Sequence, residues 1–160
     1  MKLLSDASEY ALRAVVWLGQ EPRRSWKVRE IAQHIDAAPG YLVKVLQLLA
    51  RAGILSAQRG SSGGYTMIRS PTEVTIADVI RATDPIERIE RCPLGIAAHG
   101  RMLCPLHRRV DEALALIERT FASITIAELI GESSKTNLGC DCLVSLKSEG
   151  SVDAAPSNQS

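Results

Sequence analysis

The sequence predicts a mainly α-helical protein with a small β-hairpin, built as a winged helix-turn-helix with a long C-terminal dimerisation helix. Two short amphipathic helical segments, separated by a tight break at residues 37–40, predict the helix-turn-helix. A glycine-rich stretch between two short β-prone segments predicts the wing. A longer helical segment at residues 105–122, with one apolar stripe, predicts the dimerisation helix.

The first helix is expected over residues 5–20, where apolar side chains lie on nearly all sides of the helix. Such a pattern is typical of a helix buried in the core. Ser5 or Asp6 can cap its start, and Pro22 ends it.

The second and third helices are expected at about residues 28–36 and 39–52. Pro39 suits the first turn of the third helix, and Gly53 suits a left-handed C-terminal cap. The inward stripe of the third helix is apolar, whereas its outward face carries Gly40, Tyr41, Val43, Lys44 and Gln47.

The wing is expected from strands at residues 54–58 and 65–69, which flank the turn Arg59-Gly60-Ser61-Ser62-Gly63-Gly64. The turn lacks a Gly-Lys-Ser/Thr sequence and is not followed by a helix, so its glycines do not predict a nucleotide-binding loop.

The same helix-start pattern occurs twice after the wing. Thr75 with Asp78 predicts a capping box for a fourth helix, and residues 124–128 repeat the device with a hydrophobic staple between Ile124 and Leu129. We interpret the two stretches as two helix starts, not as an internal repeat.

The long helical segment has an apolar stripe and a charged opposite face. The stripe suits contact with a second helix, either in the same domain or in a symmetric dimer, whose two-fold symmetry would match a palindromic DNA site. It consists of Leu106, Val110, Ala113, Leu114, Ile117 and Phe121.

Composition limits the classes of function. The chain has 160 residues, of which 46% are hydrophobic and 23% charged, and no apolar run approaches the roughly 20 residues of a membrane span. Asp6 and Glu9 interrupt the apolar start, so we expect no secretory signal and no membrane partner. Four cysteines in such a chain favour a reducing, cytoplasmic location and metal or redox roles.

The net charge of +1 hides an asymmetry along the chain. Residues 1–71 carry ten Lys or Arg against five Asp or Glu, whereas residues 72–160 carry nine against thirteen. The basic first half predicts a polyanionic partner, and in the context of a winged helix that partner is double-stranded DNA.

Soft metal ligands gather in residues 91–107, which hold two of the four cysteines and two of the three histidines. Cys104 and His107 are three residues apart at a helix start, so both face one side of the helix. The positive potential of the helix N-terminus favours a thiolate at Cys104.

These motifs resemble the Rrf-two family of bacterial winged-helix regulators, which includes the iron–sulfur cluster assembly repressor and the nitric-oxide-sensing repressor. The resemblance covers about residues 1–131 and is carried by Glu9-Tyr10-Ala11-Leu12-Arg13, Tyr41-Leu42-Val43-Lys44, Arg59-Gly60-Ser61-Ser62-Gly63-Gly64-Tyr65 and Thr75-Ile76-Ala77-Asp78-Val79-Ile80. It implies a homodimer in which each third helix enters a major groove and each wing reaches a minor groove.

By position, the resemblance implies that Tyr41, Val43 and Lys44 approach bases or phosphates, with Gln47 nearby and Arg59 in the minor groove. The chemistry agrees, because a guanidinium suits the negative potential of a narrow minor groove. Glycines let a wing backbone approach DNA, and helix N-termini favour phosphate, so the expected DNA-binding set also includes Lys27, Arg29, Gly40, Gly60, Gly63 and Gly64.

Cluster-binding members of the family place three cysteines in the soft-ligand loop, and Cys92 and Cys104 match the outer two. Ala98 stands at the middle position, so the resemblance favours a [2Fe–2S] cluster with mixed ligands over a three-cysteine [4Fe–4S] cluster. The implied ligands are Cys92, Cys104, His107 and Glu9, the last of them from elsewhere in the fold or from the partner subunit.

Alternatives stay open at this site. Zinc could bind Cys92, Cys104, His107 and one more ligand, or no metal binds at all. His99 is a substitute ligand, and Cys140 and Cys142 in the polar tail could supply thiolates, form a redox pair or have no role.

The sequence therefore predicts a DNA-binding transcriptional regulator whose DNA affinity is switched by an iron–sulfur cluster or by redox state. The alternative is a cluster-free relative switched by thiol oxidation, a small molecule or a protein partner. The third alternative is an electron carrier or enzyme that uses the same loop. No base, nucleophile or substrate-binding constellation in the sequence supports an enzyme. The expected regions are 1–82 for DNA binding, 83–104 for the sensor loop, 105–131 for dimerisation and 132–160 for a tail.

Overall fold

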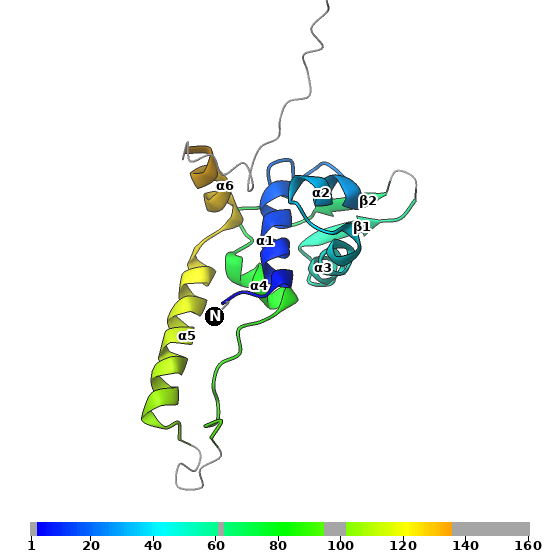
Figure 1. Ribbon diagram of the computed structural model, residues 1–160. Coiled ribbons are helices and arrows are strands. Elements are labelled where there is room, and N and C mark those ends of the chain that lie inside the picture. The colour runs from blue at the N-terminus through cyan, green and yellow to red at the C-terminus, as the bar shows by residue number, and fades with distance from the viewer. Residues whose placement is uncertain (1–2, 61–62, 95–101, 136–160) are drawn as a thin grey trace, which may run out of the picture.

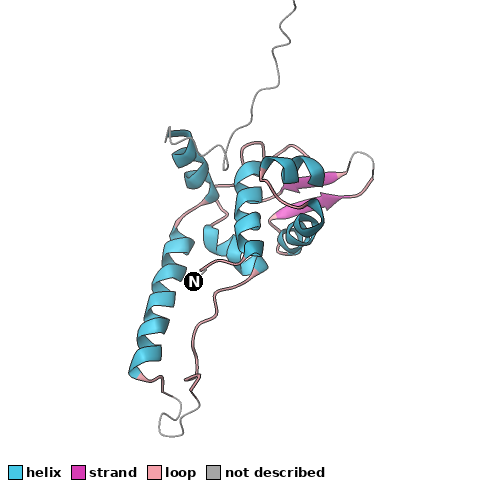
Figure 2. Ribbon diagram, viewed as in Figure 1, coloured by secondary structure: helices cyan, strands magenta, loops and turns pink. Residues whose placement is uncertain are grey.

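The computed structural model describes residues 3–60, 63–94 and 102–135, with side chains up to residue 132. It confirms the expected fold class: a small antiparallel hairpin lies at the edge of the helical part, beside α2 and α3, and one long helix extends from the compact part (Figures 1 and 2). In chain order the elements are α1 (Asp6–Leu18), α2 (Val28–His34), α3 (Pro39–Arg51), β1 (Leu55–Gln58), β2 (Gly64–Met67), α4 (Ile76–Thr83), α5 (Pro105–Ser123) and α6 (Ile126–Lys135).

Helix α1 lies at the centre of the core, as its apolar surface predicts. Its side chains pack against α3, α4 and α6, and Ala11, Ala14 and Val15 are fully buried. The helix starts at the Ser5 cap and ends at Leu18, two residues earlier than expected. A Cβ at Gly19 would lie 2.9 Å from the Cδ1 atom of Ile130, so α6 approaches the end of α1 closely.

The helix-turn-helix is formed by α2 and α3. Helix α2 stops at His34 because Asp36, inside the range expected to be helical, takes a left-handed φ of 50°. Helix α3 buries its predicted apolar stripe and ends before Gly53, whose φ of 72° is the expected left-handed conformation.

The wing is a hairpin with the register Leu55↔Met67 to Gln58↔Gly64. A third segment extends it, because Trp26 pairs with Tyr65 through two backbone hydrogen bonds of 3.0 and 2.8 Å. Residues 61–62 of the turn lie outside the described residues.

Both predicted capping boxes are present. The Thr75 side chain accepts from the Asp78 N–H while Asp78 accepts from the Thr75 N–H, each at 3.2 Å. Thr125 and Glu128 repeat this exchange at the start of α6. The two threonines also form an antiparallel bridge, so the two helix starts lie side by side.

Helix α5 forms an arm that extends from the compact part, and the chain that leaves α4 runs outward beside it to the tip (Figure 1). Only Ala115 is buried on this helix, whereas Leu106 is 65% exposed, Val110 41% and Leu116 59%. Within the described residues, no helix is long and apolar enough to cross a membrane.

Candidate metal centre and nucleic-acid interface

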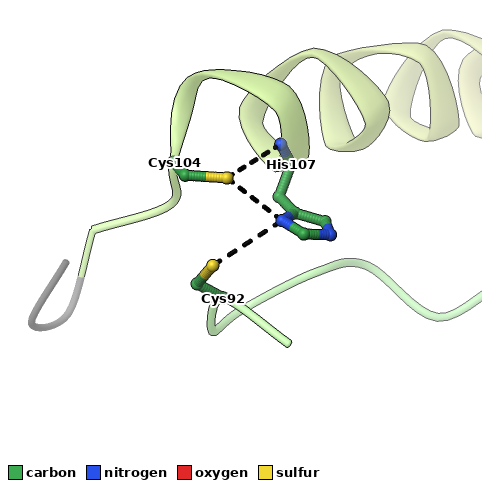
Figure 3. A group of neighbouring side chains, drawn as sticks. All are labelled: Cys92, Cys104 and His107. Atoms are coloured by element: carbon green, nitrogen blue, oxygen red, sulfur yellow. Dashed lines mark hydrogen bonds between the residues drawn. The ribbon is translucent and has the colours of Figure 1, made fainter. Parts of the chain in front are cut away.

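Three potential metal ligands converge at the tip of the arm, and we call Cys92, Cys104 and His107 the soft-ligand group. Their ligand atoms all lie within 4.8 Å of one another. The His107 Nδ1 atom is 3.1 Å from the Cys104 sulfur and 3.6 Å from the Cys92 sulfur (Figure 3). The structure thus joins two ligands that are three residues apart in sequence with one that is 12 residues before Cys104.

Cys104 is placed by the start of α5. It is the N-terminal cap of the helix, Pro105 follows it, and its sulfur accepts the His107 backbone N–H at 3.5 Å. This N–H bond, helped by the His107 side chain and Cys92, lowers the pKa of the Cys104 thiol from its ordinary 9.0 to about 7. A buried sulfur with this pKa is available as a thiolate near neutral pH.

A salt bridge joins the 84–92 segment to α5 about one helical turn from His107. Both oxygens of Asp111 accept from the Arg88 guanidinium, at 2.7 and 2.5 Å, and one of them also accepts the Ile89 N–H at 3.0 Å. The charged face of α5 that the sequence predicts includes Asp111. The structure places Asp111 and Glu118 of that face against Arg88 of the chain's own 84–92 segment, and no local pattern linked Arg88 to α5.

The donor set fits a soft or borderline metal. Two thiols and one imidazole are ligands of both iron–sulfur clusters and zinc, and a fourth ligand would complete either. Glu9, half-buried on α1, is not part of the soft-ligand group within one chain. Ala98, His99, Cys140 and Cys142 lie outside the described residues.

The predicted DNA-contacting side chains lie on α3, the wing and the start of α2. Gly40, Tyr41, Lys44 and Gln47 are exposed along the first turns of α3, and Val43 is half-buried. The Tyr41 ring packs edge-on against Tyr10 of α1, with 5.8 Å between ring centroids. The other exposed members of the predicted set are Lys27, Arg29, Arg59 and Gly60.

Two wing glycines have a structural role in addition to the predicted one of letting the wing backbone approach DNA. A Cβ at Gly63 would lie 2.3 Å from the Gln58 carbonyl oxygen, and one at Gly64 would lie 2.6 Å from that of Trp26. Both are therefore required by contacts inside the protein. Gly60 has open space around it but takes a φ of 112°, which favours glycine.

Comparison with known proteins adds to this geometry. The Rrf2 family model, described as an iron-dependent transcriptional regulator, matches residues 4–132. The transcriptional regulator NsrR of Geobacillus kaustophilus is 29% identical over 133 residues, which cover 79% of this chain and 88% of that protein.

Solved structures share the fold. CymR (YrzC), the global cysteine regulator of B. subtilis, superposes with a TM-score of 0.65 at 23% identity, covering 82% of this chain and 98% of that one. T. potens IscR superposes with a TM-score of 0.63 at 22% identity, covering 86% and 92%.

Proposed function

Because the chain belongs to the Rrf2 family of transcriptional regulators and is not an enzyme, we propose that an iron–sulfur cluster at the soft-ligand group switches its affinity for DNA. The convergence of Cys92, Cys104 and His107 carries this proposal. A [2Fe–2S] cluster with Glu9 of a partner subunit as fourth ligand fits the donor set best, because the chain itself brings together three ligands.

A second copy of the chain would complete the molecule. The first turns of the apolar stripe of α5 are exposed at Leu106 and Val110. Such a face on a long helix suits a symmetric two-helix contact. Pairing through it would also hold the DNA-binding parts of the two copies, which we call the heads, at a fixed separation. A palindromic site requires such a fixed separation.

The switch would act through linkage between ligand binding and head spacing. The 84–92 segment joins the soft-ligand group directly to α4, which packs on α1 and α3 of the head. A cluster at the group would supply sensitivity to oxidants and to iron supply. Its gain or loss would bias the conformation of this segment, and reciprocally DNA binding would alter cluster retention.

Iron content tests the cluster proposal. After anaerobic purification and reconstitution with iron and sulfide, we expect a coloured protein that loses iron in a Cys92→Ala/Cys104→Ala variant. A Cys140→Ser/Cys142→Ser variant removes the same number of thiols outside the group and should keep its iron. A colourless wild-type protein after reconstitution would refute a bound cluster, and a Cys92→Ala/Cys104→Ala variant with full iron would refute the ligands.

Salt dependence tests the DNA-binding surface. For binding to a random-sequence duplex, Lys44→Ala and Arg59→Ala should each reduce the slope of log K against log salt concentration by about one, the loss expected for one phosphate contact. Arg119→Gln, on the arm, removes a positive charge from outside this surface and should leave the slope unchanged. Equal slopes for all three variants would contradict the assignment of Lys44 and Arg59.

Thiol oxidation without a cluster is the second candidate. The sulfurs of Cys92 and Cys104 both contact one His107 nitrogen, and Cys104 has a lowered pKa of about 7. A peroxide would oxidise the Cys104 thiolate to sulfenic acid, and the Cys92 thiol would then displace water to form a disulfide. Loss of two free thiols from the metal-free protein on peroxide treatment, with no effect of reconstituted iron on DNA affinity, would favour this candidate.

A further inference from the structure

The chain between α4 and α5 is held on α5 at few points. Among the residues that the structure describes, its polar contacts with α5 come from Arg88, Ile89 and Cys92. Arg88 and Ile89 both bind the Asp111 carboxylate, whereas Cys92 reaches the His107 ring. Hence the position of the Cys92 sulfur depends on how firmly Arg88 and Ile89 are fixed.

The two contacts lie close together along α5. Cys92 lies four residues after Arg88, and His107 lies four residues, or about one helical turn, before Asp111. The segment runs antiparallel to α5 (Figure 1), and beyond the Arg88–Asp111 contact its Cys92 meets His107 one turn closer to the tip of the arm. A displacement at the salt bridge would therefore move Cys92 away from the other two ligands.

The salt bridge has the features of a strong pair. The guanidinium binds both carboxylate oxygens, an arrangement that fixes direction as well as distance. The Asp111 side chain is only 18% exposed, and Glu118 lies 3.7 Å from the same guanidinium. The Arg88 guanidinium also holds the pKa of Asp111 at about 2, so the carboxylate is charged throughout the neutral range.

We propose that the Arg88–Asp111 salt bridge positions Cys92 against Cys104 and His107 and thereby assembles the soft-ligand group. Neither residue is a metal ligand, so both act as positioning residues. The inference rests on the proposed function in so far as the group binds a cluster, but the approach of the two thiols is measurable without any metal.

The test uses the metal-free full chain with Cys140→Ser and Cys142→Ser, so that two thiols remain. Equilibration with reduced and oxidised glutathione gives the effective concentration of Cys92 and Cys104 toward each other, and non-reducing electrophoresis excludes disulfides between chains. Arg88→Gln and Asp111→Asn should each lower this effective concentration about fivefold, the effect of losing one charge-assisted pair. The Arg88→Gln/Asp111→Asn double variant should fall no further than Asp111→Asn alone.

Arg109→Gln is the matched control. It breaks an exposed salt bridge with Glu112 on the same helix, close to the group, and should leave the effective concentration unchanged. Values for Arg88→Gln and Asp111→Asn within twofold of wild type would overturn the inference, as would an equal loss in Arg109→Gln. Unchanged circular dichroism of each variant confirms that the comparison is between folded proteins.

Iron reconstitution of the parent protein separates the two proposals. If it holds no iron while the thiol measurement responds to Arg88, the cluster proposal fails and the positioning role stands. If it holds iron while the thiol measurement does not respond, the positioning role fails and the cluster proposal stands.

Discussion

At the scale of single residues, Cys104 shows how a helix start tunes a thiol. The largest cause of its lowered pKa is a backbone N–H, that of His107, and the imidazole contributes less. Backbone groups remain when side chains are replaced. The reactivity of Cys104 should therefore depend only in part on the identity of residue 107.

The pH dependence of alkylation checks this point. In the metal-free wild-type protein, iodoacetamide should modify Cys104 with a midpoint near pH 7, because the thiol is protonated below that pH and is a thiolate above it. In His107→Ala the midpoint should rise but stay below the ordinary 9.0, since the residue 107 N–H is retained. Mass spectrometry of the peptide containing Cys104 measures both midpoints, and a wild-type midpoint near 9 would contradict the lowered pKa.

At the scale of elements, the features that the sequence predicted are those encoded locally. The Thr75 box, the Gly53 cap and the buried stripe of α3 each depend on residues within a few positions, so their patterns are readable. Asp36 was missed because aspartate is compatible with a helix end as well as with a left-handed conformation, so residue type alone did not place the end of α2.

Only the locally encoded part of the candidate site was predictable from the sequence. Cys104 and His107 share one helical turn, so their convergence followed from spacing. Arg88 was missed because its partner, Asp111, is 23 residues away and periodicity says nothing about a contact between a loop and a helix. The ligand roles of Glu9, Cys92, Cys104 and His107 stay predictions.

The Thr75 box has a measurable energy. Thr75→Ala removes the hydroxyl that accepts the Asp78 N–H, and should lower the free energy of unfolding by about 1 kcal/mol. Thr120→Ala is the control, because that threonine lies inside α5 and its hydroxyl only bonds the Leu116 carbonyl. Chemical denaturation at one protein concentration compares the two variants, and equal stabilities would argue against a capping role for Thr75.

At the scale of the whole molecule, α5 contacts its own chain at some positions and exposes apolar side chains at others. Asp111 and Glu118 contact the chain's own Arg88, whereas Leu106 and Val110, at the start of the predicted apolar stripe, are exposed. Two residues of the predicted charged face are thus used within the chain. The exposed start of the apolar stripe is the surface that the proposed dimer would use.

A charge on the apolar face tests this division. Val110→Glu should convert the proposed dimer to a monomer, because pairing would bury the carboxylate without a partner. Light scattering after size exclusion measures the mass, and Arg119→Gln, on another side of the helix, should stay dimeric. A dimeric Val110→Glu protein would mean that subunits pair elsewhere.

The bridge between Thr75 and Thr125 has a consequence for how such proteins diversify. The Ile76 N–H bonds the Ile124 carbonyl at 3.1 Å and the Ile126 N–H bonds the Val74 carbonyl at 2.8 Å, so the chain returns to the point from which it departed. The two ends of the stretch between these bonds therefore lie next to each other in the fold. Evolution, or a protein engineer, could exchange the distal part of that stretch for one with another chemistry while the DNA-reading part keeps its own architecture.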